Sequence, residues 1–384
     1  MRDHNVDPNR RLILAGAAGA LGTGLALGPL VVPRARAESR QTGAGPVTVT
    51  AMVRGLDEPW AIAFLDNRRY LITERDGRLL YFDGSESSKR VDGVPNVYAE
   101  GQGGLLDVVV ARDFASSGEI FLSYAERRGG AGATAVARAR FDPTGPRLTG
   151  VTPIFRMSTA SRGGRHFGSR IVEARDGTLL VTLGDRGAAE RAQDPQVHNG
   201  KVVRITRRGG VPSDNPFVGG GALPEIYSLG HRNAQGAALD AQGRYWTVAH
   251  GAQGGDEINQ PRPGRNYGWP RISYGRNYNG SKIGEGTSAP GLEQPAFYWD
   301  PSIAPSGLMI YSGRLWPAWR GQFFVGSLKF DMISRLAPSG SGFTEAERMF
   351  SGVYSRIRDV REAPDGSIWF LSVGDGATYR ITPV

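Results

Sequence analysis

The sequence predicts an all-β protein, a six-bladed β-propeller with four strands in each blade. Short apolar runs rich in Val, Ile, Leu, Tyr and Phe recur along the chain, separated by Asp-Gly, Asn-Gly or Gly-Gly turns. No long stretch repeats its apolar residues at the helical period, so these runs are expected to be strands. A larger unit, an apolar run followed by a turn and a second run, recurs roughly six times at a spacing typical of propeller blades, about 45 to 70 residues.

The six units follow one another over most of the chain, and each is expected to supply strands of one blade. A sandwich or a barrel of this size would need far fewer strands or two domains, so the propeller is favoured. In a propeller, connecting loops meet at one mouth of the central channel, where residues distant in sequence come together. The paired runs are residues 60–65 with 79–82, 105–110 with 120–124, 169–172 with 176–182, 235–240 with 243–248, 307–311 with 322–327, and 357–361 with 365–371.

Residues 1–37 are interpreted as a twin-arginine export signal. Arg10 and Arg11 precede an apolar stretch, residues 15–32, that is too short and too Gly-rich to span a membrane, and Ala-Arg-Ala (35–37) is a small-x-small cleavage site. The alternative is an ordinary secretory signal that holds two arginines by chance. We therefore expect residues 38–384 to form a single catalytic domain that is periplasmic or otherwise exported, and that does not span the membrane after cleavage.

Composition narrows the possible chemistry. Cysteine is absent, which removes disulfides, thiolate nucleophiles and Cys-based metal sites from consideration. The formal net charge of +9 falls to +6 without residues 1–37, and the remaining basic residues are scattered. With no recognisable nucleic-acid-binding module, nucleic acid is not an expected partner.

Polar residues stand beside several of the repeats, where a propeller would bring them to one cavity. They include one histidine and several cations, and a site is expected to take one or two residues from each repeat. These residues are Gln102, His166, Arg232, Asn233, Lys329, Arg356 and Arg358.

Seven segments occur in an order that resembles the soluble glucose/sorbosone dehydrogenases, which depend on pyrroloquinoline quinone (PQQ), and most closely their bacterial aldose sugar dehydrogenase branch. The resemblance covers nearly all of the chain after the leader and implies a six-bladed propeller, in agreement with the repeats. The segments are His-Phe-Gly-Ser-Arg-Ile (166–171), Leu-Gly-Asp-Arg-Gly (183–187), Gly-His-Arg-Asn-Ala-Gln-Gly (230–236), Gly-Gly-Asp-Glu-Ile-Asn (254–259), Asn-Tyr-Gly-Trp-Pro (266–270), Ile-Ala-Pro-Ser-Gly (303–307) and Arg-Ile-Arg-Asp-Val (356–360).

The resemblance implies oxidation of an aldose at its anomeric carbon to the lactone, with electrons passed on to an external acceptor, either a quinone or a cytochrome. His166 matches the family's base, which takes the hydroxyl proton while hydride leaves. Asp185 matches the carboxylate that orients this imidazole. Arg232 and Asn233 match the pair that hydrogen-bonds the quinone oxygens and stabilises the charge that develops there.

The resemblance also implies the binding sites for the cofactors, PQQ and Ca²⁺. Lys329, Arg356 and Arg358 resemble a clamp for the quinone carboxylates, and Gln102 and Ser302 complete the expected contacts. For calcium, the matching positions are the backbone carbonyls of Gly251 and Ala252, since carbonyl oxygens suit a hard cation. A structural calcium is implied near Glu257 and Tyr267, although the pair Asp256-Glu257 alone could equally be a solvated turn.

Three positions depart from the family pattern. Arg165 precedes the base where relatives usually have Asp or Asn, and a cation there would disfavour the imidazolium unless its side chain points away. Ser302 replaces a more usual Thr and Ala252 a more usual Pro, which should matter little because the hydroxyl and the carbonyl oxygen are retained. Tyr298 and Trp299 could stack on a pyranose ring, but core packing is the favoured interpretation.

Two other functions remain possible on the same architecture. A calcium-dependent lactonase or related hydrolase would be expected to gather Glu, Asp and Asn side chains around a metal in the channel, in place of a Lys and Arg clamp. A non-catalytic binding propeller would be expected to have lost part of the set formed by His166, Asp185, Arg232, Asn233 and Lys329. The sequence favours the dehydrogenase over both.

Overall fold

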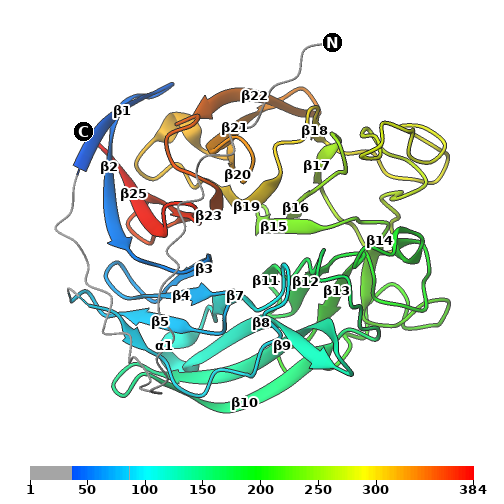
Figure 1. Cartoon of the computed structure of the whole chain (residues 1–384), viewed down its shortest axis with the longest axis horizontal. Coiled ribbons are helices and arrows are strands. Elements are labelled where there is room, and N and C mark those ends of the chain that lie inside the picture. Colours follow the sequence, from blue (N-terminus) through cyan, green and yellow to red (C-terminus); the bar gives the residue numbers. More distant parts are fainter. Residues whose placement is uncertain (1–36, 86) are drawn as a thin grey trace, which may run out of the picture.

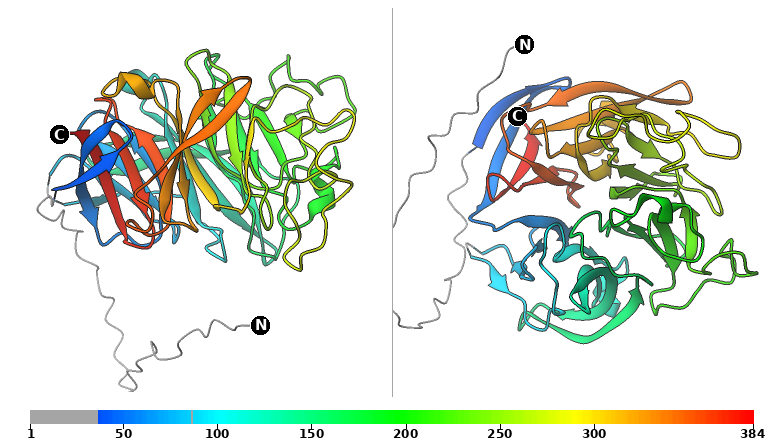
Figure 2. Two further views of the ribbon diagram at one scale, coloured as in Figure 1. Left: turned by 90° about the horizontal axis from the view of Figure 1, so that it is seen from above. Right: turned by 45° about the vertical axis from the view of Figure 1, so that its right-hand side comes forward.

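The strands form six antiparallel sheets around a central axis, so the predicted six-bladed propeller is confirmed (Figure 1). The computed structural model describes residues 37–85 and 87–384. Seen from the side, the sheets stand next to one another in a flat disc (Figure 2). The predicted export signal lies outside the described residues except for its last position, Ala37.

The first five blades hold four strands each, in chain order. The first contains β3 (Pro59–Phe64), β4 (Tyr70–Glu74), β5 (Leu79–Phe82) and β6 (Lys89–Arg90). The second contains β7 (Leu105–Val110), β8 (Glu119–Arg128), β9 (Ala131–Asp142) and β10 (Arg147–Arg156). The third contains β11 (Ile171–Glu173), β12 (Leu179–Leu183), β13 (Lys201–Ile205) and β14 (Ile226–Leu229). The fourth contains β15 (Ala234–Leu239), β16 (Tyr245–Ala249), β17 (Asp256–Asn259) and β18 (Phe297–Trp299). The fifth contains β19 (Pro305–Ile310), β20 (Phe323–Ser327), β21 (Met332–Ser339) and β22 (Gly342–Met349).

The sixth blade joins the two ends of the described chain. Its sheet order is β23 (Ile357–Glu362), β24 (Ile368–Ser372), β25 (Ala377–Pro383), β2 (Gly45–Arg54) and β1 (Ala37–Thr42). The expectation of four strands per blade is therefore exceeded here, because β1 folds back on β2 as a hairpin and adds a fifth strand. The strand β2 precedes the first repeat, yet it pairs with the last strand of the chain, which closes the ring.

The first strand of every blade lies next to the axis. Contacts run from β3 to β7, β11, β15, β19 and β23 in turn, and then from β23 back to β3. Helical segments are short in the part of the chain that the structure describes: α1 (Phe114–Ser117) and the 3₁₀ turns Ala189–Ala192 and Pro317–Trp319. Among those residues no helix has the length and apolar character needed to cross a membrane.

The repeats found in the sequence correspond to blades, with one difference. In five repeats the two apolar runs are the first and second strands of a blade, but in the first repeat the second run, residues 79–82, is the third strand β5. The strand between them, β4, was not recognised as part of that unit. Its Asp-Gly turn, Asp76-Gly77, accordingly joins β4 to β5, whereas Asp176-Gly177 and Asp365-Gly366 join first strands to second strands.

These Asp-Gly turns share one local mechanism. The Asp176 carboxylate accepts a hydrogen bond from the Thr178 N–H at 2.9 Å, and Gly177 between them has φ of +80°. Asp365 and Ser367 repeat this arrangement at 2.9 Å around Gly366, whose φ is +88°. The aspartate closes the turn with its own side chain, and glycine adopts the left-handed conformation without steric cost.

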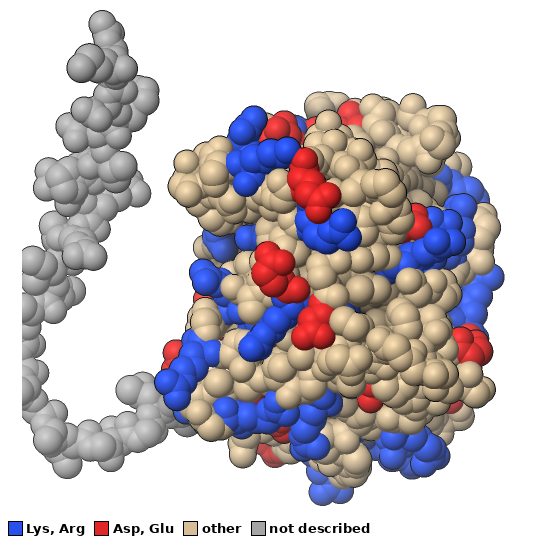
Figure 3. All heavy atoms as spheres, turned by 90° about the vertical axis from the view of Figure 1, so that its right-hand side faces the viewer, with Lys and Arg blue, Asp and Glu red and all other residues tan. Residues whose placement is uncertain are grey.

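The hydrophobic core lies between the blades. One cluster joins Leu71 and Leu79 of the first blade to Leu105 and Leu122 of the second, and another joins the fifth blade to the sixth through residues such as Phe324 and Phe370. Each sheet thus buries both faces against its neighbours. On the face shown in Figure 3, Lys and Arg are scattered over the surface with Asp and Glu among them.

Candidate active site

Loops from most of the blades surround a cavity of about 1160 Å³. It brings together eight of the residues that the sequence analysis predicted for the site, although they come from widely separated segments. Five cations, Arg75, Arg276, Lys329, Arg356 and Arg358, line it against two carboxylates, Glu58 and Asp300. The eight predicted residues in its wall are Gln102, Asn233, Gly251, Ala252, Ser302, Lys329, Arg356 and Arg358.

A smaller cavity of about 20 Å³ adjoins the large one and shares His250 and Gly251 with it. Three further predicted residues, Arg232, Glu257 and Tyr267, line this smaller cavity. Eleven of the thirteen predicted residues therefore line one of two adjoining cavities, and the remaining two, His166 and Asp185, line neither. The consecutive residues Arg232 and Asn233 line different cavities, Arg232 the smaller one and Asn233 the larger one.

His166 and Asp185 form a close pair beside the large cavity: neither lines it, but Phe167 and Gly168, which follow His166, do. The Nδ1 atom of His166 lies 2.7 Å from Oδ1 of Asp185. Asp185 also accepts hydrogen bonds from the Gly187 N–H at 2.7 Å and, through its other oxygen, from Nε1 of Trp269 at 2.9 Å. Because the carboxylate accepts from Nδ1–H, the Nε2 atom of His166 keeps its lone pair and can take a proton.

The backbone around His166 is held from two sides. The His166 N–H donates to Oε1 of Gln102 at 2.7 Å, so the predicted cofactor contact Gln102 also fixes the base. On the other side, a Cβ at Gly184 would lie 1.9 Å from the carbonyl oxygen of His166, so only glycine allows the two segments to approach this closely.

Burial lowers the pKa of His166 below its usual 6.5, and the cations Arg232 and Arg165 lower it further, while Asp185 opposes the shift. Burial would raise the pKa of Asp185, but its contacts with His166, Gly187 and Arg232 hold that pKa below the usual value. The pair therefore consists of a neutral imidazole and an ionised carboxylate near pH 7. The guanidinium of Arg165 lies over Gly187, close enough to act on His166 through its charge.

The three residues of the expected clamp keep their positive charges free. In the part of the chain that the structure describes, none of Lys329, Arg356 and Arg358 forms an ion pair with a carboxylate. Arg356 donates to the Leu328 carbonyl at 3.2 Å, and Arg358 donates to Oε1 of Gln235 at 2.9 Å. Burial and neighbouring cations, Arg356 first among them, lower the pKa of Arg358 to about 9. Uncompensated cations on one wall suit a ligand with several carboxylates.

The expected calcium carbonyls belong to a tight turn organised by Asp256. This buried carboxylate accepts hydrogen bonds from the Gly251 N–H at 2.8 Å and the Ile303 N–H at 2.7 Å. It also accepts from the hydroxyl of Ser302 at 2.8 Å, and the Ser302 oxygen accepts from the Ala304 N–H at 3.2 Å, so one lone pair of Ser302 remains for a ligand. The interpretation of Asp256-Glu257 as a solvated turn is wrong, because both residues belong to β17 and Asp256 is fully buried.

Comparison with known proteins agrees with this geometry. A family model described as glucose/sorbosone dehydrogenase matches residues 56–380. Aldose sugar dehydrogenase YliI of Escherichia coli (strain K12) is 42% identical over 350 residues, which cover 88% of this chain and 94% of that protein. The chain belongs to the glucose/sorbosone dehydrogenase family. The resemblance drawn from the seven segments is thereby confirmed, as is the predicted class of enzyme, an oxidoreductase.

Further relatives extend the comparison. The crystal structure of the soluble aldose sugar dehydrogenase (Asd) from Escherichia coli in the apo-form superposes with a TM-score of 0.85 at 40% identity, and the match covers 88% of this chain and all of that one. Quinoprotein glucose dehydrogenase B of Acinetobacter calcoaceticus is 25% identical over 404 residues, covering 83% of this chain and 84% of that protein. This family member thus shares both fold and most of its length with enzymes named for sugar oxidation.

Several residues that build the site were not singled out from the sequence. Trp269, which orients Asp185, and Gln235, which contacts Arg358, stand inside quoted segments, 266–270 and 230–236, but were given no role. Asp256 was noted only as a possible calcium neighbour. All three form hydrogen bonds to residues distant in sequence. The only sequence signal for them was that they lie inside the seven segments that resemble the family. Trp299 is buried and its Nε1 donates to Ser334, which agrees with the core role favoured for it. The same interpretation is wrong for Tyr298, which is 44% exposed and stacks on Tyr274.

Proposed function

We propose that this family member oxidises aldose sugars at the anomeric carbon to the lactone, using PQQ and Ca²⁺, and passes the electrons to an external acceptor, either a quinone or a cytochrome. The observation that carries the proposal is the His166–Asp185 pair, which a hydrogen bond from the His166 N–H to Gln102 joins to the wall of a cavity. In that wall Lys329, Arg356 and Arg358 have no carboxylate partners among the described residues. The names of two relatives, an aldose sugar dehydrogenase and a quinoprotein glucose dehydrogenase, support it.

The pair supplies the proton step. With Nδ1 bonded to Asp185, His166 takes the proton of the sugar's anomeric hydroxyl on Nε2, and the ionised carboxylate stabilises the imidazolium that forms. The lowered pKa of His166 keeps the imidazole neutral and ready to accept that proton at neutral pH. PQQ, when bound, supplies an electrophilic carbonyl as the hydride acceptor.

The cavity wall supplies the binding groups for the quinone. Lys329, Arg356 and Arg358 would hold its carboxylates through charge-assisted hydrogen bonds. Asn233, in the same wall, and Arg232, in the adjoining smaller cavity, would stabilise the negative charge that the quinone gains. Gln102 and Ser302 add polar contacts. A donor set dominated by Lys and Arg fits this polyanionic cofactor, and it also argues against the lactonase alternative, which would need carboxylates around a metal.

Calcium fits the turn that follows β16. Gly251 packs so closely on this turn that a Cβ would lie 2.1 Å from the Gly254 carbonyl oxygen, and the backbone there is rich in carbonyls that can serve as ligands. Gly251 and Ala252 would hold the ion through their backbone carbonyls. At the second expected position, Glu257 offers oxygens, as does Oδ1 of Asn259, which has no hydrogen-bond partner in the described part of the chain. The Tyr267 hydroxyl already donates to the Gln260 carbonyl and accepts from the Arg262 N–H. We therefore assign the metal contact there to Glu257, with Tyr267 restricted to its backbone.

The expected location and domain organisation belong to the same proposal. A twin-arginine signal over residues 1–37 would deliver residues 38–384 to the periplasm as one catalytic propeller. Substrate and electron acceptor would then both be met outside the cytoplasm.

Reconstitution tests the proposed function directly. The purified chain is loaded with PQQ and Ca²⁺, and aldoses are screened with an artificial electron acceptor. We expect reduction of the acceptor that depends on both PQQ and calcium, and loss of holoenzyme on chelation. Oxidation with a nicotinamide cofactor, or equal quinone binding without calcium, would refute the mechanism. A lactone panel in the same assay tests the hydrolase alternative, and inactivity in both would favour a binding propeller.

A further inference from the structure

Gln235 stands where three parts of the cavity wall meet. It lies on β15 and lines the large cavity. Its Nε2 donates to the Gly168 carbonyl at 3.2 Å and to Oδ1 of Asn233 at 3.3 Å, and its Oε1 accepts from Nη1 of Arg358 at 2.9 Å. One carboxamide thus links the turn that carries the base His166, the neighbouring Asn233 and a cation from the sixth blade.

These contacts decide which face of the Asn233 amide is offered to a ligand. Oδ1 of Asn233 accepts from Gln235 and also from the Gly168 N–H at 3.0 Å, so the oxygen is turned away from a ligand. The Asn233 NH₂ group donates to nothing among the residues that the structure describes. Asn233 is therefore presented to the cavity as a hydrogen-bond donor.

The same contacts orient Arg358 without cancelling its charge. A carboxylate at this position would form an ion pair with the guanidinium, whereas the neutral amide oxygen of Gln235 only accepts a hydrogen bond. The charge of Arg358 therefore remains available to an anionic ligand. A Gln at this point does what neither a Glu nor an apolar residue could do.

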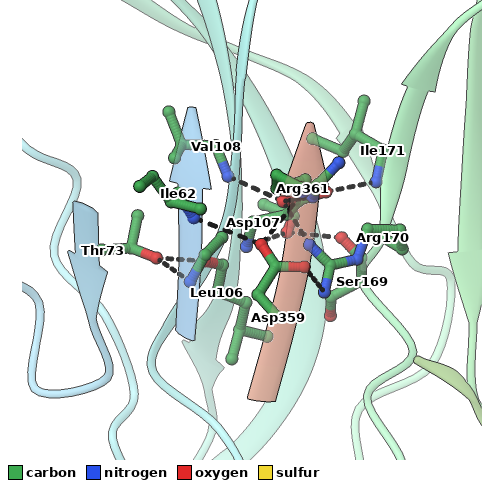
Figure 4. A network of polar contacts seen from close by, with 12 residues as sticks. Ile62, Thr73, Leu106, Asp107, Val108, Ser169, Arg170, Ile171, Asp359 and Arg361 are labelled. Carbon is green, nitrogen blue, oxygen red and sulfur yellow. Dashed lines mark hydrogen bonds and ion pairs between the residues drawn. The ribbon is translucent and has the colours of Figure 1, made fainter. Parts of the chain in front are cut away.

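The backbone of Gln235 is anchored on a buried ion network near the axis. Nε of Arg170 donates to the Gln235 carbonyl at 3.0 Å, and its guanidinium pairs with Asp107 at 2.8 Å and Asp359 at 3.3 Å. Arg361, on β23, contacts the carboxylates of both Asp107 and Asp359. Two arginines and two aspartates from three segments of the chain therefore balance one another's charges (Figure 4). Arg170 is 1% exposed, which leaves little freedom for the strand start that carries Gln235.

We propose that Gln235 is a positioning residue of the dehydrogenase: it fixes Asn233 as a donor toward the quinone and orients Arg358 toward the quinone carboxylates. The proposal rests on the function proposed above. Gln235 acts on turnover through Asn233 and on cofactor affinity through Arg358, and these two effects can be measured separately.

A double-mutant cycle tests it. Wild type, Q235M, N233A and Q235M/N233A are compared for PQQ affinity, from quenching of tryptophan fluorescence in the calcium-loaded apo chain, and for turnover at saturating PQQ. We expect Q235M to lower both quantities about tenfold, the usual scale for a lost hydrogen bond to a charged or developing-charge partner. In the N233A background the further loss of turnover caused by Q235M should shrink to less than about twofold, because the partner is gone.

The outcomes separate the two proposals. An undiminished tenfold loss in the N233A background, or unchanged PQQ affinity in Q235M, would overturn the role of Gln235. Failure of the wild type to bind PQQ would instead overturn the proposed function. If Q235M does not fold, Q235E serves in its place; its carboxylate should neutralise Arg358 and weaken PQQ binding more than tenfold, and unchanged binding would refute the proposal. Gln242→Met, at an exposed turn far from the cavity, is the matched control and should leave all values unchanged.

Discussion

His166 has a backbone φ of +54°, a conformation that residues other than glycine rarely adopt. Ser169, Arg186, Ala304 and Arg356 also have positive φ, and all of them belong to segments that form the site. Such conformations persist only where surrounding contacts over-determine them, as Gln102 does for His166. The roles of His166 and Asp185 were predicted from the family resemblance of the segments 166–171 and 183–187. The hydrogen bond from Trp269 to Asp185 was not predicted, because it joins residues 84 positions apart and has no local sequence signal.

Replacing the base tests its role. His166→Asn should leave PQQ binding largely intact and lower turnover by about two to four orders of magnitude, the usual contribution of a positioned acid–base group. Asp185→Asn should cause a smaller loss of the same kind, because it removes orientation and charge but leaves the imidazole. Turnover per bound cofactor and PQQ affinity are measured separately. Lost PQQ binding with unchanged turnover per cofactor would contradict the assignment.

The activity should persist into mildly acidic solution. A base must be neutral, so kcat/KM falls as the pH drops through the pKa of His166, and burial together with the nearby cations places that pKa below 6.5. Arg165→Ala removes one of the charges that lower this pKa, so the acidic limb of the pH profile should move to higher pH. Arg208→Ala, at an exposed loop, is the control. A limb that stays in place in Arg165→Ala would show that its charge does not reach the base.

The clamp can be tested at Lys329. Its amine lies 5.0 Å from the Phe330 ring and has no carboxylate partner in the described part of the chain, so its charge is free for the quinone. Lys329→Ala should weaken PQQ binding by about ten- to a hundredfold, the worth of one charge-assisted contact. Excess PQQ should restore part of the activity. Lys89→Ala, which removes an exposed surface lysine paired with Asp83, should bind PQQ like the wild type.

At the scale of the strands, neighbouring blades are joined by buried hydroxyl groups. The Thr73 hydroxyl on β4 donates to the Leu106 carbonyl of β7 at 2.6 Å, and the Ser123 hydroxyl on β8 donates to the Ser169 carbonyl at 2.6 Å. The Thr182 hydroxyl on β12 likewise donates to the Ala234 carbonyl of β15, in the fourth blade, at 3.0 Å. The strands themselves were predictable from apolar runs and turn residues. These links were not, because each hydroxyl is one polar residue within an apolar run and its partner lies in another blade.

Thr182 and Thr247 provide a matched pair for this feature. Both are fully buried threonines on second strands, but Thr182 accepts from the Arg170 N–H and donates to the Ala234 carbonyl, both at 3.0 Å, whereas the Thr247 hydroxyl has no partner among the described residues. Thr182→Val should lower the free energy of unfolding by about 1–3 kcal/mol, since two buried polar groups lose their partner. Thr247→Val should be neutral or stabilising. Equal losses in denaturant unfolding would contradict this reading.

At the scale of the whole molecule, the ring is closed by two segments from opposite ends of the chain. The strand β2 pairs with β25 over residues 47–54 and supplies the fourth strand of the last blade. The number of blades was predictable from the repeats, because each repeat carries its own signal. The closure was not, since pairing between residues more than three hundred positions apart leaves no local pattern, and β2 reads as one more apolar strand before the first repeat.

Truncation distinguishes the two N-terminal strands. The side chains of β1 alternate between exposed and half-buried, so a chain that begins at Gly45 should remain folded. A chain that begins at Gly55 also loses Val47, Val49 and Val53, which are at most 1% exposed. Each buried valine contributes about 1.5–3 kcal/mol, and three of them rival a total stability of about 5–15 kcal/mol. The shorter chain also leaves β25 as an unpaired edge. Size-exclusion chromatography should show aggregation of this chain, and thermal unfolding should show no cooperative transition. A peptide of residues 45–54 should prevent the aggregation and restore cooperative unfolding. Cooperative unfolding without aggregation in the absence of the peptide would refute closure by β2.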